Sequence, residues 1–316
     1  MILSAGLTPA WQRTLVFDRL LPGEVNRATQ AVESASGKVL NVGRACRALN
    51  ASVTTLSVCG GLTGTAMQAE WVRDQISARW VETPAATRTC TTLIDRRTET
   101  VTELVENALP LRAEDLGRYL QAFAEEAAAA DVVVLTGSLP PQTPTDFYAV
   151  LMQKAAGRMI LDVRGPELRG ALPLHPWLVK PNRAELEQTV GRGVRSETDI
   201  LSAMRELNQA GAEWVLVTDG PRALWITSLN EQHRILPPQN IETVNPIGCG
   251  DCLAAGVAVG LIEGMSVVDA AILGVAAAAE NATQLLPARF NRDSVDARRE
   301  QGNVNSHAHS LPWEST

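Results

Sequence analysis

The sequence predicts an α/β protein with a mainly parallel central sheet and a small antiparallel β sheet beside it. From residue 113 onward, short apolar runs alternate with longer segments of helical spacing, and this alternation indicates a parallel sheet covered on both faces. The Thr- and Val-rich runs at 87–94 and 98–105 do not fit the alternation, so they are assigned to the separate sheet. The third observation is the length of 316 residues with 45% hydrophobic content, which allows a large core.

The elements follow in chain order. Before residue 113, we expect strands at 2–7, 15–17, 29–32 and 53–58, a hairpin from 87–94 and 98–105, and helices at 41–49 and 67–78. Asn50 follows the first of these helices, where a left-handed cap is wanted. After it, we expect strands at 132–135, 159–163, 178–180, 214–218 and 224–227, with helices at 113–130, 145–156, 184–190, 199–210, 253–262 and 267–285.

Composition narrows the function classes. The net charge of −7 gives no electrostatic case for nucleic-acid binding. No uninterrupted apolar run reaches membrane-spanning length, and the first residues lack a basic leader region. The five Cys are scattered, unlike a disulfide framework. We therefore expect a cytoplasmic protein that binds neither nucleic acid nor a membrane.

The segment 243–256 is the most informative part of the chain. A Pro and two Gly precede an apolar, Ala-rich run, so a Gly-rich loop is expected to lead into a helix N-terminus. Such an end presents unpaired backbone N–H groups, and Gly248 and Gly250 would let an anion approach them. Asp251 would repel that anion. It is either a general base that faces a phosphoryl group or an ordinary acid of the first helical turn, and the motif alone leaves both interpretations open.

Cys249 and Cys252 form a C-x-x-C pattern at the same helix start, a setting that lowers a thiol pKa. A redox role and simple packing beside Gly are both compatible with this pattern. A zinc site is disfavoured because the chain has no second C-x-x-C.

Four polar segments follow strands or turns, namely 36–38, 137–140, 180–185 and 248–251. In a parallel sheet such loops meet at the carboxyl edge, where ligands bind. Asn182 and Glu185 are three residues apart and would share a helix face, although a helix start with a first-turn acid explains them equally well. Together the segments suggest a phosphoryl-transfer site. The chain has no G-x-x-x-x-G-K-[ST], no G-x-S-x-G and no G-x-G-x-x-G after its first strand, which disfavours P-loop, hydrolase and dinucleotide folds.

In this order along the chain, the motifs resemble a ribokinase-fold sugar kinase of the phosphofructokinase-B family, in the branch that contains 1-phosphofructokinase and tagatose-6-phosphate kinase. The resemblance covers about 5–290. It is carried by 7–10 (LTPA), 22–27 (PGEVNR), 37–45 (GKVLNVGRA), 87–88 (TR), 137–140 (GSLP), 177–186 (WLVKPNRAEL) and 245–251 (NPIGCGD).

The resemblance implies a ribokinase-like three-layer α/β/α fold with a small antiparallel β lid. A single kinase domain would span 1–300, its lid built from segments within about 9–36 and 86–106, and a polar tail would occupy 301–316. ATP and Mg²⁺ would be the cofactors, a sugar phosphate the acceptor, and the lid the contact of a homodimer.

The resemblance also implies roles for individual residues. Asp251 would be the base, and the N–H groups of Gly248, Cys249 and Gly250 would hold charge on the transferred phosphoryl group. The acceptor site would comprise Gln12, Gly37, Lys38, Asn41, Arg88 and Asp251, with Lys38 and Arg88 on the phosphate of the sugar. The nucleotide site would comprise Lys180, Asn182, Thr218, Gly220, Gly248, Gly250 and Asn281. Asn182 and Glu185 would orient hydrated Mg²⁺.

The departures from the family pattern lie mainly on the sugar side. Gln12 replaces the usual Asp that grips sugar hydroxyls, Cys90 replaces the usual Asn, and Val39 replaces a Gly, where a positive φ would strain it. These changes keep two alternatives open. One is a kinase of an unphosphorylated sugar or nucleoside, and the other is a non-catalytic ribokinase-fold binding protein.

Overall fold

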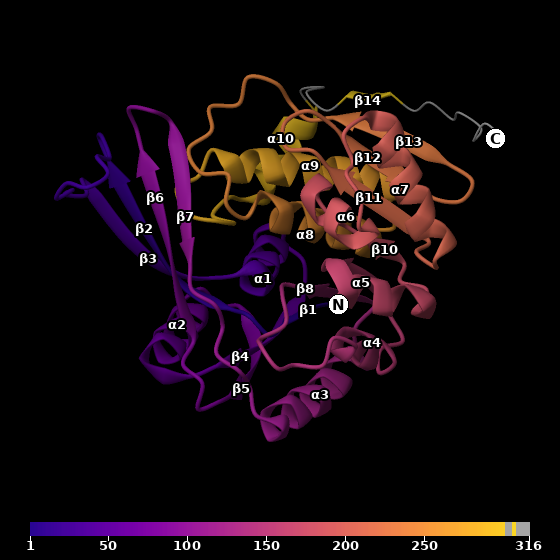
Figure 1. Ribbon diagram of the computed structural model, residues 1–316, viewed down its shortest axis with the longest axis horizontal. Coiled ribbons are helices and arrows are strands. Elements are labelled where there is room, and N and C mark those ends of the chain that lie inside the picture. The colour runs from indigo at the N-terminus through magenta and orange to yellow at the C-terminus, as the bar shows by residue number, and fades with distance from the viewer. Residues whose placement is uncertain (301–304, 308–316) are drawn as a thin grey trace.

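The computed structural model describes residues 1–300 and the strand 305–307. Its largest element is a ten-stranded sheet in the order β14-β13-β12-β11-β10-β9-β8-β1-β4-β5 (Figure 1). The strands are β1 (Ile2–Gly6), β4 (Val53–Cys59), β5 (Ser77–Glu82), β8 (Val132–Thr136), β9 (Arg158–Asp162), β10 (Leu178–Val179), β11 (Trp214–Thr218), β12 (Leu224–Thr227), β13 (Gln232–Leu236) and β14 (Asn305–His307). All pairings from β5 through β11 are parallel, and β12, β13 and β14 add antiparallel strands at one edge.

Helices cover both faces of this sheet. One hydrophobic cluster includes side chains of α1 (Lys38–Ala48), α2 (Gly61–Arg73), α8 (Cys249–Ile262), α9 (Val267–Ala282) and α10 (Arg292–Glu300). The other includes side chains of α3 (Ala113–Ala127), α4 (Phe147–Met152), α5 (Gly165–Ala171), α6 (Arg183–Val190) and α7 (Glu197–Gln209). Within β8 successive residues enter opposite clusters, Val132 the first and Val133 the second, as the pleat requires. The expected three-layer α/β/α class is confirmed.

A second, four-stranded sheet forms the lid, in the order β3-β2-β6-β7. Its strands are β2 (Ala10–Phe17), β3 (Gln30–Ser36), β6 (Arg88–Asp95) and β7 (Thr100–Val105). In Figure 1 these strands stand beside α1 and α2, apart from the large sheet. The outer pairs are antiparallel, but β2 and β6 pair in parallel. The expected antiparallel lid is therefore mixed at its centre, because β2 and β6 belong to two different hairpin-like pairs.

The structure differs from the prediction in the extent of some elements, and it contains elements that were not predicted. The helix expected at 67–78 starts earlier and ends at Arg73, Gln75 has φ +54, and the chain continues as the edge strand β5. That strand alternates polar exposed residues with apolar ones, so it lacks the apolar run of a central strand. The helix expected at 145–156 is reduced to α4, and α5, α10 and β13 were not predicted.

Other expectations hold or fall outside the described residues. Asn50 has φ +64, the left-handed conformation expected after a helix. The polar tail at 301–316 lies outside the described residues except for the backbone of β14, and the division into one domain and a tail stays a prediction. No helix in the described part of the chain is long and apolar enough to cross a membrane.

Candidate active site between the sheet edge and the lid

A cleft of about 1310 Å³ lies between the lid and the carboxyl edge of the large sheet. The lid contributes the cleft-facing positions of β2, β6 and β7, while the sheet contributes the loops after β9, β10 and β11 and the start of α8. The candidate residues that line it are Gln12, Gly37, Lys38, Asn41, Arg88, Lys180, Asn182, Glu185, Thr218, Gly220, Gly248, Cys249, Gly250 and Asp251. The structure thus brings the predicted sugar side and nucleotide side into one cavity.

The loop before α8 is shaped to present a helix N-terminus. Gly248 is the N-cap residue, with φ +84, a conformation that Gly adopts without strain. The side chain of Asn245 accepts a hydrogen bond from the N–H of Ile247 at 3.0 Å, which fixes the turn. Gly250 lines the cleft in the first turn, where backbone N–H groups have no partner within the helix.

Asp251 lies in the first turn of α8, so the helix begins earlier than the expected residue 253. It is 6% exposed, and its Oδ2 accepts a hydrogen bond of 2.8 Å from Nδ2 of Asn41 on α1. Burial, and then the charge of Asp162, raise the pKa of Asp251 to about 7, while Lys38, Asn41 and Lys180 oppose the shift. A carboxyl group with a pKa near neutrality is suited to general base catalysis.

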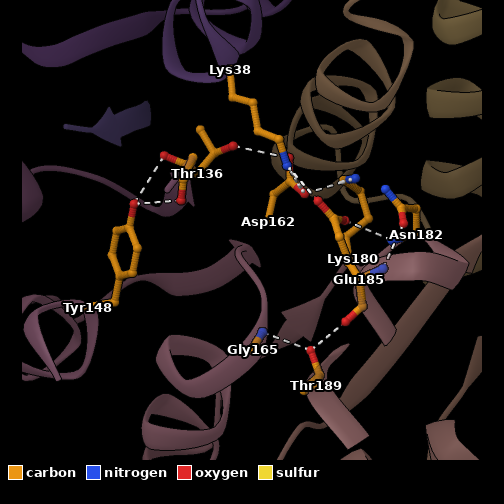
Figure 2. Close-up of polar contacts among 10 residues, drawn as sticks. Lys38, Thr136, Tyr148, Asp162, Gly165, Lys180, Asn182, Glu185 and Thr189 are labelled. Atoms are coloured by element: carbon orange, nitrogen blue, oxygen red, sulfur yellow. Dashed lines mark hydrogen bonds and ion pairs between the residues drawn. The ribbon is translucent and has the colours of Figure 1, made fainter. Parts of the chain in front are cut away.

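Figure 2 shows a cluster of two carboxylates, Asp162 and Glu185, with two lysines, Lys38 and Lys180. The charges of Asp162 and both lysines act on the pKa of Asp251. Asp162, at the end of β9, contacts Nζ of Lys180 at 3.1 Å and Nζ of Lys38 at 3.3 Å. It also accepts a hydrogen bond from the hydroxyl of Thr136 at 3.1 Å. Burial opposes ionisation of Asp162, but the charges of Lys180 and Lys38 outweigh it and hold the pKa of that carboxyl below its usual range.

Sequence reasoning missed Asp162. Its only signal was an acid at the carboxyl end of an apolar strand, the position where parallel sheets bind ligands. Sequence reasoning did single out both lysines, which are two of only three in the chain. Lys38 also contacts Glu185 at 3.2 Å. Although burial opposes it, the carboxylates of Asp162 and Glu185 hold the pKa of Lys38 above its usual range.

Asn182 and Glu185 form a reciprocal capping box at the start of α6. The side chain of Asn182 accepts from the N–H of Glu185 at 2.9 Å, and Glu185 Oε2 accepts from the N–H of Asn182 at 2.9 Å. Both residues still line the cleft. Among the described residues, no group of three or more His, Cys, Asp or Glu side chains could hold a metal ion. This donor set suits Mg²⁺ held through waters and substrate phosphates, because Mg²⁺ rarely sits in an all-protein cage.

On the sugar side, the polar groups are largely engaged by the protein itself. Gln12 donates from Nε2 to the hydroxyl of Thr92 at 2.7 Å. The guanidinium of Arg88 donates to the carbonyls of Thr8 at 3.1 Å and Glu106 at 3.1 Å, with a longer contact of 3.4 Å to that of Pro9. Arg88 therefore lines the cleft in a fixed orientation.

The loop before α1 relieves the expected strain at Val39. Gly37 carries the positive φ, +93, and caps α1, whereas Val39 lies within the helix and is not among the positive-φ residues. A Cβ at residue 37 would approach Thr8 O, Pro9 Cα and Ala10 N to 3.0 Å each. The loop thus needs Gly at position 37 and accepts Val at position 39.

Asn281 is not among the residues that line the cleft, and its side chain is buried behind the loop, so its role at the nucleotide stays a prediction. Its amide donates to Ile247 O at 2.9 Å and accepts from Ala288 N at 2.7 Å, so it supports the loop from behind. For Cys249 and Cys252, the sequence left a redox role and simple packing both open. Burial raises the pKa of Cys249 to about 11 and that of Cys252 well above its usual range, which favours the packing interpretation.

Comparison with known proteins gives one family match. The model of the family described as "pfkB family carbohydrate kinase" matches residues 4–291. The 1-phosphofructokinase of Haloferax volcanii is 32% identical over 277 residues, which cover 87% of this chain and 88% of that protein.

Solved structures agree in fold. Phosphofructokinase-2 from Escherichia coli in complex with fructose-6-phosphate is 25% identical, covering 95% of this chain and 99% of that one with a TM-score of 0.85. A protein from Thermotoga maritima described as a possible 1-phosphofructokinase is 19% identical, covering 98% and 99% with a TM-score of 0.90.

Proposed function

The chain belongs to the pfkB family of carbohydrate kinases, and on that premise we propose that it transfers the γ-phosphoryl group of ATP to a hydroxyl of a ketohexose phosphate, with Asp251 as the general base. The observation that carries the proposal is the placement of Asp251. It lies on the cleft beside the N-terminus of α8, and its pKa is raised to about 7. A carboxylate beside an anion site is unfavourable unless it accepts a proton there.

Each group of cleft residues would have its own role in the proposed phosphoryl transfer. Asp251 would take the proton from the attacking hydroxyl, and Asn41 and Gly37 line the cleft beside it. The N–H groups at the start of α8, from Gly248 to Gly250, would stabilise charge on the transferred phosphoryl group, and that of Cys249 also donates to Pro246 O at 3.2 Å. Lys180 and Lys38 add positive charge at the same place, while Asp162 keeps both lysines in position.

ATP would lie on the side of the cleft lined by Thr218 and Gly220, next to Asn182. When bound, Mg²⁺ would offset the negative charge of the phosphates, held through water by Asn182 and Glu185. Asp251 and the acceptor would lie at the other end, toward the lid. This arrangement keeps the two substrates on opposite sides of the α8 N-terminus, as in-line transfer requires.

A sugar phosphate is preferred as acceptor because cations line the lid side of the cleft and because a relative at 32% identity is a 1-phosphofructokinase. One observation favours the alternative of an unphosphorylated sugar or nucleoside, since the donors of Arg88 and the charge of Lys38 are already engaged within the protein. A non-catalytic binding protein is disfavoured because it would have no use for a buried carboxylate held near neutral pKa.

A coupled ADP-release assay over a panel of acceptors tests the proposal. Fructose 1-phosphate, fructose 6-phosphate and tagatose 6-phosphate are compared with fructose, ribose and adenosine. We expect the highest kcat/KM with one of the ketohexose phosphates. A higher kcat/KM with an unphosphorylated acceptor would overturn the assignment of the substrate and leave the kinase class intact.

We also propose that two copies associate through the lid, in a cytoplasmic enzyme. The lid strand β7 is largely exposed, and its Leu104 is 54% exposed. Apolar side chains on an exposed strand are typical of a surface that pairs with another chain. Light scattering on the wild type and on Leu104→Asp tests this, because a monomeric wild type would contradict it.

A further inference from the structure

A second, smaller cavity of about 220 Å³ adjoins the main cleft on the sugar side. Its walls come from Thr8, from Arg88 at the root of the lid, and from the loops after β8 and β9. None of its lining residues lies between 218 and 251 in the described chain, although Glu185, which is proposed to orient Mg²⁺, lines both cavities. Lys38, Arg88 and Arg164 are the basic residues that line it, and each of them also lines the main cleft.

These three cations are not equally available to a ligand. Lys38 lies against the carboxylates of Asp162 and Glu185. Arg88 donates to the backbone carbonyls of residues 8, 9 and 106. Arg164 is exposed, and within the described residues its guanidinium has no hydrogen bond or ion pair. It is therefore the cation of this cavity whose five N–H donors remain free for an anion.

Hydrogen bonds hold residues on both sides of Arg164 in the sequence, and Figure 2 labels two of them, Asp162 and Gly165. On one side, Asp162 is fixed by Lys180, Lys38 and Thr136. On the other side, the N–H of Gly165 donates to the hydroxyl of Thr189 at 3.0 Å, and this hydroxyl donates to Glu185 O at 2.7 Å. Arg164 itself has an extended backbone, with φ −141 and ψ 170. Because the backbone at residue 164 is already held in place, binding of an anion by its side chain costs little backbone entropy.

We propose that Arg164 binds the phosphate group that the acceptor sugar already carries, with that phosphate in the small cavity and the sugar ring in the main cleft. The inference rests on the proposed function, because it presumes a phosphorylated acceptor. A planar guanidinium can form two parallel hydrogen bonds to a phosphate, which a lysine cannot. Since Arg88 and Lys38 are already engaged, Arg164 decides how strongly the pocket discriminates a sugar phosphate from the free sugar.

The cavity also contains three carboxylates, which oppose an anion. Asp162 and Glu185 are paired with lysines, whereas Glu167 has no ion pair among the described residues. Glu167 is therefore the group that works against the phosphate in the same cavity. Removing the charge of Glu167 should raise the affinity for the sugar phosphate, whereas removing the side chain of Arg164 should lower it. The test therefore includes two variants with opposite expected effects.

The test measures the Kd of fructose 1-phosphate, fructose 6-phosphate and fructose by calorimetry without ATP, then KM for the acceptor and for ATP. Arg164→Ala should weaken the preferred sugar phosphate by about 10–100-fold and leave fructose affinity and KM for ATP unchanged. Arg164→Lys should recover part of the loss, and Glu167→Gln should tighten binding. Arg47→Ala is the matched control, because Arg47 is exposed on α1 and lines neither cavity.

The outcomes separate this inference from the proposed function. If the wild type phosphorylates a ketohexose phosphate and Arg164→Ala binds it equally well, the role of Arg164 is wrong and the proposed function stands. If the wild type neither binds nor phosphorylates any sugar phosphate, both are wrong. A loss of affinity of the same size for fructose would also overturn the inference, because it would show a general effect on the cleft.

Discussion

Asn41 donates a hydrogen bond of 2.8 Å to Asp251 across 210 residues of sequence. The bond favours the ionised carboxylate, because its donor faces an oxygen that carries the charge. It therefore joins α1, the first helix of the chain, to the proposed base at the start of α8. Burial dominates at this carboxyl and raises its pKa to about 7, so the bond only moderates the shift.

Asn41→Ala should move the acidic limb of the kcat profile to higher pH, because the ionised form of Asp251 loses a donor. Near pH 6 we expect a loss of roughly threefold to tenfold beyond any loss at high pH. Asn41→Asp should move the limb further, since a second carboxylate replaces the donor. The measurement is kcat against pH for the three proteins. An unchanged limb in both variants would mean that Asp251 does not set the profile.

Asp162→Asn should move the same limb to lower pH. The charge of Asp162 raises the pKa of Asp251, and its loss also frees Lys38 and Lys180 to favour the Asp251 carboxylate. Because the base must be ionised, the wild-type rate should rise as pH increases through about 7. The variant should also lose absolute rate, because Lys38 and Lys180 lose their ion-pair partner. The measurement is therefore the pH at which the limb lies and not the rate itself. A limb that moves upward would contradict the coupling.

Removing the buried carboxyl group should stabilise the ligand-free protein at alkaline pH. The pKa of Asp251 is raised from 3.8 to about 7, so folding disfavours the charged form. Stability should therefore be lost as pH rises from about 4 to about 7, and the loss is complete above that range. The shift corresponds to at most about 4 kcal/mol. Melting curves should show Asp251→Asn above the wild type near pH 8, with a smaller gap near pH 5. A gap that does not depend on pH would contradict this account.

Gly250 and Gly248 should respond differently to alanine. A Cβ at Gly250 would meet only Lys180 Nζ at 3.5 Å, so Gly250→Ala should fold normally while its methyl group obstructs the anion at the helix start. At Gly248 the backbone has φ +84 and a Cβ would lie 2.8 Å from Cβ of Pro287. Gly248→Ala should therefore lower the melting temperature as well as kcat. Equal melting temperatures with equal kcat values would show that neither glycine shapes the cradle.

The sequence predicted most of the sheet and the segments of the site, because strand ends and helix starts leave local signals. The turn before α8 and the capping box at Asn182 belong to this class. What it could not predict depends on contacts between distant residues. The role of Asp162 depends on its ion pairs with Lys38 and Lys180, which are far from it in the sequence. The hydrogen bonds of the Asn281 side chain with Ile247 and Ala288 are contacts of the same kind. The edge strand β5 lacked an apolar run, so nothing in its pattern separated it from the helix before it.

The most direct test of the whole account is the kcat of Asp251→Asn on the best ketohexose phosphate, measured together with the affinity for ATP. The variant retains the shape and the helix start but has no group that can accept the proton. We predict that kcat falls by about 10²–10⁴-fold, as is typical for the loss of a general base, while ATP binds as tightly as before or more tightly. A kcat close to that of the wild type would contradict the assignment of Asp251 as the base.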